Sequence, residues 1–241
     1  MTNQARTALV TGANKGLGKE IARRLAATGM TVALGARDEN RGRAAAAEVG
    51  GRFVRLDVTD PASVDAAMEA VGDLDVLVNN AGVAVEWGVE PEEIGADEVR
   101  RTYEVNVFGV VTVTRAAIPR LRPGARVVNM SSPLGSLALM SDPDSPEHFH
   151  RLLAYNSSKA ALNALTIMYA NLLRPKGILV NAVSPGLVGT DLNGYRPGAN
   201  GVRTVEEGAQ VPVRAALFGP DGPTGRFLAD DGPAVDGRIP W

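Results

Sequence analysis

The stretch Thr11-Gly12-Ala13-Asn14-Lys15-Gly16-Leu17-Gly18 decides the fold. It lies between a short apolar run, Thr7–Thr11, and a segment whose apolar residues recur at helical spacing. Gly12 permits a sharp turn, Gly16 lets the backbone approach a pyrophosphate, and Gly18 lets a helix pack closely on a strand. The amino end of the helix offers free N–H groups and a partial positive charge to the phosphates. A glycine turn placed between a strand and a helix therefore predicts a dinucleotide site in an α/β sheet.

Strand and helix patterns alternate through the rest of the chain. The apolar runs are near-continuous, which is typical of strands buried on both faces of a sheet. The predicted strands are Thr7–Thr11, Thr31–Ala36, Arg52–Leu56, Val76–Asn79, Arg126–Met130 and Leu179–Val183, with a late one in Thr224–Ala229. The predicted helices are Leu17–Thr28, Arg41–Val49, one opened by Asp60 and Pro61, Asp97–Leu121 and Ala154–Leu173. This order predicts an α/β fold, with a single Rossmann-like, doubly wound parallel sheet of about seven strands and helices on both faces. We expect one domain over residues 1–241.

The composition removes several classes of function. The chain has 241 residues, a formal net charge of −2 and no cysteine, so disulfides, thiolate metal sites and cysteine nucleophiles are ruled out. Without an excess of positive charge we expect no nucleic-acid partner. No stretch reaches the about 20 apolar residues that cross a bilayer, so we expect no membrane association. The first residues lead into a strand pattern rather than a signal peptide, which favours a cytoplasmic protein.

Further motifs follow in chain order, most of them at the ends of the predicted strands, with Asn106 inside the long helix and Tyr155 and Lys159 opening the next helix. They are Asp57-Val58, Asn79-Asn80-Ala81-Gly82, Asn106 within Val105-Asn106-Val107, Ser131-Ser132, Tyr155 and Lys159 four positions apart, and Ser184-Pro185-Gly186 followed by Thr190. Together with the glycine turn, this ordered set resembles the short-chain dehydrogenase/reductase family over Thr7 to Asp191. A Lys15/Arg37 pattern, an insertion before the tyrosine and the end segment 219–228 make it similar to the carbonyl-reductase-like branch.

The resemblance implies a nicotinamide dinucleotide held by the glycine turn and by the strand ends. It implies that Asp57 binds the adenine amino group and that Asn80, rather than Asn79, contacts the cofactor. Thr190 is expected to bind the carboxamide or the pyrophosphate. The implied cofactor contacts are Gly12, Asn14, Lys15, Gly16, Leu17, Gly18, Arg37, Asp57, Val58, Asn80, Ala81, Gly82, Tyr155, Lys159, Pro185, Gly186, Val188 and Thr190.

The end of the second strand bears on which nicotinamide cofactor is bound. An acidic residue there holds the ribose 2′-hydroxyl and repels a 2′-phosphate. Here the strand ends in Ala36, Arg37 follows, and Lys15 faces the same place in relatives with this pattern. Two cations can bind one phosphate through charge-assisted hydrogen bonds. We therefore expect NADP(H) rather than NAD(H). The alternative is that both cations are solvated surface charges, which Asp38 beside Arg37 favours.

Tyr155 and Lys159 stand one turn apart on one helical face. A free phenol has a pKa of about 10, and a nearby ammonium lowers it. The resemblance implies that Tyr155 donates a proton to a carbonyl oxygen in reduction and takes it back in oxidation, while Lys159 tunes Tyr155 and binds the nicotinamide ribose. It implies that Ser132, with Ser131 as the fallback, binds the substrate oxygen and that Asn106 holds a water linked to Lys159. Each residue taken singly is also compatible with a purely structural role.

Ser132 and Tyr155 are further apart than is usual in the family, which indicates an insertion over residues 134–151. It contains the only histidines, His148 and His150, for which a pocket wall or a solvated loop fits better than a metal site, because a third ligand is lacking. We expect no bound metal.

A glycine-punctuated stretch, 189–208, predicts a substrate lid beside the nicotinamide. Its Asn193, Tyr195 and Pro197 are expected to shape the substrate pocket together with Trp87, Leu134 and Leu137.

The expected activity is hydride transfer between NADPH and a small ketone or aldehyde, reversible to the alcohol. Two other functions stay open. One is a non-catalytic NADP(H)-binding sensor, although sensors often lose a catalytic residue and none is missing here. The other is a nucleotide-sugar epimerase or dehydratase, which resembles longer chains with a different glycine turn. The sequence does not identify the substrate, its stereochemistry or the direction of the reaction. It leaves homodimer, homotetramer and monomer open.

Overall fold

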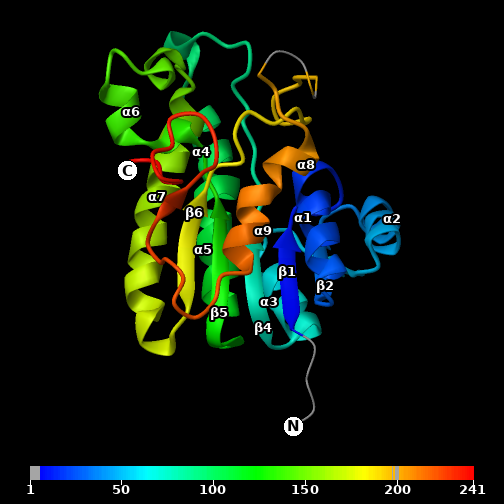
Figure 1. Ribbon diagram of the computed structural model, residues 1–241. Coiled ribbons are helices and arrows are strands. Elements are labelled where there is room, and N and C mark those ends of the chain that lie inside the picture. Colours follow the sequence, from blue (N-terminus) through cyan, green and yellow to red (C-terminus); the bar gives the residue numbers. More distant parts are fainter. Residues whose placement is uncertain (1–5, 197, 199–200) are drawn as a thin grey trace.

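A computed structural model describes residues 6–196, 198 and 201–241, and within them the strands form one seven-stranded parallel sheet in the order β3-β2-β1-β4-β5-β6-β7 (Figure 1). The strands are β1 (Thr7–Thr11), β2 (Thr31–Ala36), β3 (Arg52–Arg55), β4 (Leu74–Asn79), β5 (Leu121–Met130), β6 (Leu179–Val183) and β7 (Phe227–Leu228). Most of their residues are buried, as the near-continuous apolar runs predict.

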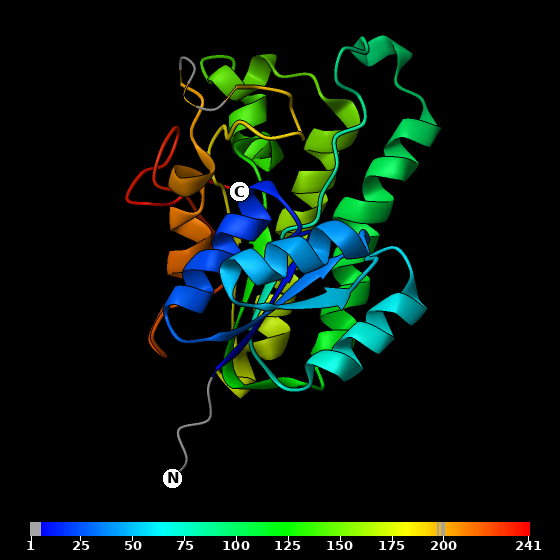
Figure 2. The ribbon, with the colours of Figure 1, turned by 90° about the vertical axis from the view of Figure 1, so that its right-hand side faces the viewer.

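Helices cover both faces of the sheet, and each face has its own apolar core (Figure 2). On one side lie α1 (Gly16–Ala27), α2 (Glu39–Val49), α8 (Val205–Gly208) and α9 (Gln210–Ala216). On the other lie α3 (Pro61–Val71), α4 (Ala96–Tyr103), α5 (Val110–Ala117) and α7 (Leu153–Leu173). Successive strand residues point to opposite faces, so Val10 packs under α1 while Leu9 packs under α3. The predicted fold class is confirmed.

The predicted helix Asp97–Leu121 is wrong in two respects. A π-helical segment, Glu104–Gly109, separates α4 from α5, and α5 ends at Ala117. Pro119 explains the early end, because a proline has no backbone N–H to donate to the carbonyl oxygen four residues earlier in a helix. Leu121 then pairs with Leu74, so β5 and β4 both begin earlier than predicted, with a register irregularity after Leu74.

The order of strands reverses between β1 and β4, because β1 leads outward to β2 and β4 leads the other way to β5. Ligands of such sheets bind in the crevice outside the carboxyl ends of the strands at this switch point. The insertion, which contains the short helix α6 (Leu137–Ser141), and the described residues between β6 and α8 both lie at that end of the molecule, opposite the start of β1 (Figure 1).

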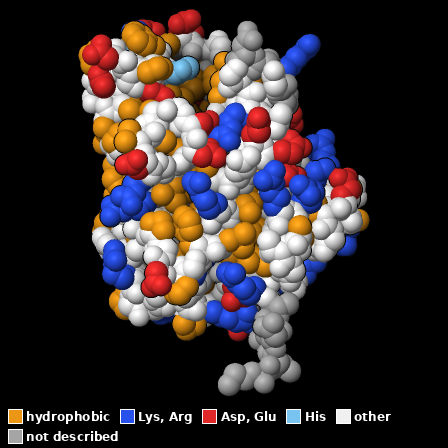
Figure 3. Space-filling model, in the orientation of Figure 1, with side chains coloured by type: hydrophobic (Ala, Val, Ile, Leu, Met, Phe, Trp, Pro, Cys, Tyr) orange, Lys and Arg blue, Asp and Glu red, His pale blue; other side chains and the backbone are white. Residues whose placement is uncertain are grey.

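The last residues of the chain form and cover the edge strand β7 of the sheet. β7 pairs in parallel with β6, and the Trp241 ring stacks on Phe227 with 5.7 Å between ring centroids. Among the described residues, none of the helices is both long and apolar enough to span a bilayer. Acidic and basic side chains are interspersed over the face seen in Figure 3, in line with the small net charge of −2.

Candidate active site

A cleft of about 1200 Å³ opens along the carboxyl edge of the sheet. Every predicted cofactor contact lines it, and so does Ser132, whereas Asn106 does not. Drug-sized ligands occupy pockets of about 300–1,000 Å³. The larger volume here leaves room for a dinucleotide together with a small substrate.

The glycine turn has the geometry that a pyrophosphate needs. Gly16 has a φ of +53°, a conformation that L side chains rarely adopt. A Cβ added to Gly18 would lie 2.6 Å from the Gly12 carbonyl oxygen, so any side chain there would push α1 off β1. Lys15, at the N-cap position of α1, makes no side-chain capping bond. The first N–H groups of the helix are therefore available to an anion, and the turn fits a dinucleotide phosphate.

Asn80 and Thr11 fasten β4 to the glycine turn. The Asn80 amide nitrogen donates to the carbonyl oxygens of Thr11 and Gly12 at 2.9 and 3.2 Å. The Thr11 hydroxyl accepts from the backbone N–H groups of Asn80 and Ala81, both at 2.9 Å. Asn79 instead points into the core, where its amide nitrogen donates to Asn129 and to a threonine. Of the two asparagines, only Asn80 lines the cleft.

The end of the cleft next to β2, where the adenosine is expected, carries cations and lacks an acid at the strand end. Ala36 is buried there, while Arg37 is exposed and Arg41 of α2 also lines the cleft. Asp38, the acid beside Arg37, caps α2 by accepting from the Arg41 N–H at 3.0 Å. Lys15 differs from expectation because its ammonium is ion-paired with Asp191 of the opposite wall. That pairing lowers the pKa of the Asp191 carboxyl.

Asp57, the residue expected to meet the adenine, lines the cleft and is held by its own turn. Its Oδ1 accepts from the Thr59 N–H at 3.0 Å and from the Thr59 hydroxyl at 2.8 Å. The other carboxylate oxygen of Asp57 takes no part in these bonds, and the residue lines the cleft beside Val58.

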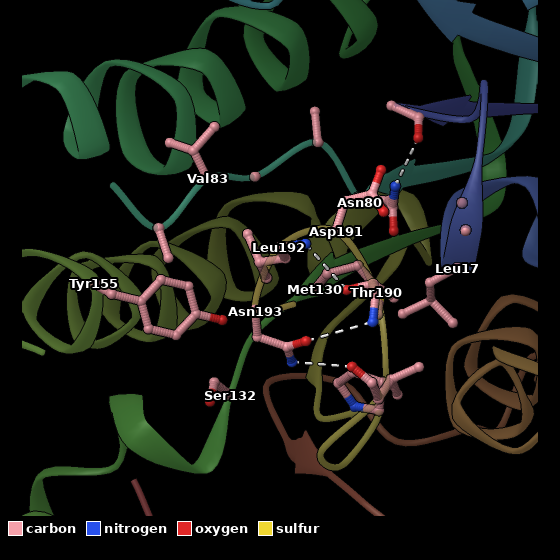
Figure 4. Close-up of a pocket in the computed structure, with 18 of the residues that line it drawn as sticks. Leu17, Asn80, Val83, Met130, Ser132, Tyr155, Thr190, Asp191, Leu192 and Asn193 are labelled. Atoms are coloured by element: carbon pink, nitrogen blue, oxygen red, sulfur yellow. Dashed lines mark hydrogen bonds between the residues drawn. The ribbon is translucent and has the colours of Figure 1, made fainter. Parts of the chain in front are cut away.

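Tyr155 and Lys159 lie in the first two turns of helix α7, at the other end of the cleft. Both side chains are almost fully buried, at 8% and 5% exposure. The Lys159 Nζ lies 5.4 Å from the centre of the Tyr155 ring and donates to the Met130 carbonyl oxygen at 2.8 Å. Figure 4 shows the phenol reaching from α7 into the hollow shared by Ser132 and Asn193.

Burial shifts the pKa values of Tyr155 and Lys159 in opposite directions. Burial raises the pKa of Tyr155 to about 12, and the Ser132 hydroxyl, as a hydrogen-bond partner, opposes the rise. Burial also lowers the pKa of Lys159 to about 8. The expectation that the ammonium lowers the phenol pKa below its ordinary value is therefore wrong for this state, because desolvation of the phenolate dominates. Below about pH 8 the pair consists of a neutral phenol and an ammonium.

The two serines after β5 have different surroundings. The Ser131 hydroxyl donates to Asn163 Oδ1 at 2.6 Å and is thereby tied to α7. Ser132 faces Tyr155, and its hydroxyl oxygen accepts from the Leu134 N–H at 3.3 Å. The geometry favours Ser132 over Ser131 as the residue that meets a substrate oxygen.

Asn106 lies in the π-helical segment and is fully buried. Its amide accepts from the Val83 N–H and donates to the Val83 carbonyl oxygen, both at 2.9 Å. It donates also to the Ser158 hydroxyl at 3.0 Å. A Cβ added to Gly82 would lie 3.4 Å from Asn106 Oδ1 and 3.8 Å from Lys159 Nζ, so these two atoms flank the same glycine.

Comparisons with known proteins agree with this geometry. A model of the short chain dehydrogenase family matches residues 6–199. The (+)-neomenthol dehydrogenase of Arabidopsis thaliana is 36% identical, over 88% of this chain and 92% of the relative. Carbonyl reductase (NADPH) 1 of Rattus norvegicus is 33% identical, over 95% and 98%. The structure of NADPH-bound carbonyl reductase from chicken fatty liver superimposes with a TM-score of 0.82 at 27% identity, covering 98% of this chain and 99% of that one.

The chain belongs to the short-chain dehydrogenase/reductase family. Its relatives are of the carbonyl-reductase-like type, so both parts of the predicted resemblance are confirmed.

Two loops of this short-chain dehydrogenase/reductase meet over the substrate end of the cleft. Trp87, from the loop after β4, makes an edge-to-face contact with Tyr195, with 6.3 Å between ring centroids. Asn193 donates to the Val188 carbonyl oxygen at 3.0 Å and so folds the segment after β6 over the hollow. Pro197 lies outside the described residues. Leu134 lines the cleft, but Leu137 does not, and it is 65% exposed.

The two histidines of the insertion have separate surroundings. His150 lines the cleft, whereas the His148 ring nitrogen Nδ1 is bonded to the Met140 carbonyl oxygen at 2.9 Å. The described part of the chain contains no group of three or more His, Cys, Asp or Glu side chains arranged to hold a metal.

Sequence reasoning missed several residues of the site. Arg41 stands four positions after Arg37, at the start of α2, and this nearby second cation was a usable signal. Asp191 follows Thr190 directly, but its partner lies 176 positions away. Glu86 and Ser158 carried no signal of their own, because their importance arises from tertiary contacts: Glu86 accepts from the Tyr155 N–H of α7, and Ser158 accepts from Asn106 of the π-helical segment.

Proposed function

We propose that this protein is a carbonyl reductase that transfers hydride reversibly between NADP(H) and a small ketone or aldehyde, with Tyr155 as the general acid. As a carbonyl-reductase-like short-chain dehydrogenase/reductase it is an NADP-dependent enzyme. One observation carries the proposal further: Tyr155, Lys159 and Ser132 lie together at one end of a cleft whose other end presents Arg37.

The cofactor is held along the length of this cleft. The glycine turn and the free N–H groups of α1 bind the pyrophosphate, and Asp57 with Val58 borders the adenine. Arg37 and Arg41 bind the ribose 2′-phosphate, which an acid at the position of Ala36 would repel. Pro185, Gly186, Val188 and Thr190 line the nicotinamide end. When bound, NADPH supplies the hydride for the carbonyl carbon.

The chain itself supplies the proton. Ser132 donates a hydrogen bond to the carbonyl oxygen and places it beside the Tyr155 hydroxyl. As negative charge develops on that oxygen, Tyr155 transfers its proton to it and an alcohol results. The Lys159 ammonium stabilises the phenolate that remains. Asn106 holds a water beside Gly82 through which the proton on Tyr155 is replaced.

The walls around Tyr155 define the kind of carbonyl compound that fits. Trp87, Tyr195, Leu134 and Leu192 line this end and present apolar and aromatic surface. Such walls favour aryl or alicyclic carbonyl compounds over small charged ones.

The test is a substrate panel followed through the absorbance of NADPH. An aromatic aldehyde, an alicyclic ketone and an ortho-quinone are each incubated with the protein and with NADPH or NADH. We expect multiple turnovers with at least one class and a higher kcat/KM with NADPH. A chain that binds NADPH but turns over none of them behaves as a sensor. Equal or faster turnover with NADH contradicts the cofactor assignment.

A further inference from the structure

Glu86 is a buried carboxylate that belongs to the loop after β4. Only 1% of its surface is exposed. Its two oxygens accept from backbone N–H groups at the start of α7: from Tyr155 at 2.6 Å and from Ala154 at 3.0 Å. These residues are 69 and 68 positions away in the sequence, so the contact is purely tertiary.

Helix α7 has no capping residue of its own. Leu152 occupies the N-cap position and makes no side-chain capping bond. The first N–H groups of a helix need acceptors, and a negative charge there is favoured by the helix dipole. Glu86 supplies both from outside the helix. The residue it caps most closely is Tyr155.

The backbone carbonyl group of Tyr155 is hydrogen-bonded to a side chain as well. The Tyr155 carbonyl oxygen accepts from the Ser158 hydroxyl at 2.7 Å, and Ser158 in turn accepts from Asn106 at 3.0 Å. Side chains therefore hold both the N–H and the C=O of this one residue. A tyrosine backbone fixed at both ends fixes the point from which the ring extends into the cleft.

The loop that carries Glu86 also forms the substrate wall. Asn106 pins Val83 through two hydrogen bonds near the start of this loop. Val85 and Trp87, on either side of Glu86, line the cleft. Glu86 thus sets the distance between the wall that a substrate contacts and the helix that presents the phenol.

We propose that Glu86 is a positioning residue that holds the Tyr155 hydroxyl at the carbonyl oxygen of the substrate, an inference that rests on the proposed role of Tyr155. Among the described residues, the hydrogen bonds of the Glu86 carboxylate go to backbone N–H groups of α7, and in this proposal Glu86 takes no part in proton transfer. Its effect passes through the backbone of Tyr155. A displacement of about 1 Å at a reacting group lowers a rate by about 10²-fold.

Glu86→Gln tests this, because glutamine keeps the shape but offers one acceptor oxygen, and its NH₂ group faces the second N–H. Three quantities are compared with the unmodified chain: kcat on the best panel substrate, the Kd of NADPH, and hydrogen exchange in the peptide over residues 153–157 without cofactor. Asp60→Ala is the matched control. Asp60 caps α3 by accepting from the Ala62 N–H at 3.0 Å, and it does not line the cleft that contains Tyr155. The control variant therefore removes a helix cap without touching the site.

The expected result for Glu86→Gln is a kcat lower by about 10- to 100-fold, faster exchange at the start of α7, and an unchanged Kd for NADPH. Asp60→Ala lowers the melting temperature and leaves kcat and this exchange unchanged. Glu86→Asp keeps two oxygens on a shorter chain and recovers part of the activity. If the glutamine variant does not fold, Glu86→Asp replaces it as the test variant. We then expect changes in kcat and exchange in the same direction but of smaller size, and again an unchanged Kd for NADPH.

An unchanged kcat in a folded Glu86 variant overturns the inference, and so does a lower kcat without faster exchange. Tyr155→Phe, measured alongside, keeps the two proposals apart. If Tyr155→Phe retains full activity, the proposed function has failed. If it is inactive while the Glu86 variants are fully active, only the role of Glu86 has failed.

Discussion

The two ends of the cleft are built in opposite ways. At the end proposed to bind the adenosine, the charged side chains are exposed: Lys15 and Asp191 have side-chain exposures of 54% and 78%. At the catalytic end, Tyr155 and Lys159 are almost fully buried. Charges in solvent interact weakly and are screened by salt, whereas buried polar groups are costly to misplace.

This difference predicts how each end responds to change. Substitutions at the exposed end change the affinity for the cofactor by modest factors that depend on salt. Substitutions at the buried end change kcat by large factors, because position decides the outcome there.

The largest of these effects is expected from Ser132→Ala. Loss of one hydrogen bond to a developing oxyanion lowers kcat by about 10²- to 10³-fold. Ser131→Ala is the matched control, since its hydroxyl serves Asn163 instead. It lowers the free energy of unfolding by about 1 kcal/mol and leaves kcat unchanged. Steady-state kinetics and urea unfolding of both variants decide this, and equal losses of kcat contradict the assignment of Ser132.

The pH dependence follows from the separated pKa values. The pKa of Lys159 is lowered to about 8, so its ammonium is present below that pH and lost above it. The pKa of Tyr155 is raised to about 12, so the phenol keeps its proton throughout this range. We expect kcat/KM for carbonyl reduction to fall by about tenfold for each pH unit above 8, because the phenolate loses its stabilising charge. A rate constant that stays flat to pH 10 contradicts this account.

Arg37→Ala tests the selection of the cofactor. Removing the guanidinium lowers kcat/KM for NADPH by about tenfold and leaves that for NADH nearly unchanged. Kinetics with both cofactors at two salt concentrations measure this, and the loss is smaller at high salt. A parallel decrease with NADH shows that Arg37 has another role.

The smallest effect is expected from Asp191→Asn. The change frees Lys15 from its ion pair and tightens NADPH binding by about two- to fivefold at low salt. Binding is followed through the fluorescence of the bound cofactor, with kcat as the control. Weaker binding of NADPH means that the pair closes the cleft around the cofactor rather than competing with it.

Local patterns predicted most of the fold. The strand bounds of β1, β2 and β6 agree residue for residue, because buried parallel strands are near-continuous apolar runs. The predicted helix Asp97–Leu121 was too long because the prediction followed apolar periodicity and did not allow for Pro119, which disrupts a helix. The π-helical segment around Asn106 left no local signal, because tertiary contacts to Val83 and Ser158 select it.

The site residues that lie at strand ends and in the glycine turn were predictable, because the order of strands along the chain brings these segments to one edge of the sheet. Contacts between distant segments were not predictable. The pairing of Lys15 with Asp191 and the capping of α7 by Glu86 both join residues more than sixty positions apart. The direction of the Tyr155 pKa shift was also missed, because it depends on how completely the fold buries the phenol.

The most direct test of the account is a single turnover by Tyr155→Phe that is already saturated with NADPH. The account predicts an unchanged Kd for NADPH and a rate of hydride transfer lower by about 10²- to 10⁴-fold, because the proton donor is gone while the cofactor site is intact. A variant that binds NADPH and transfers hydride as fast as the unmodified chain would contradict it.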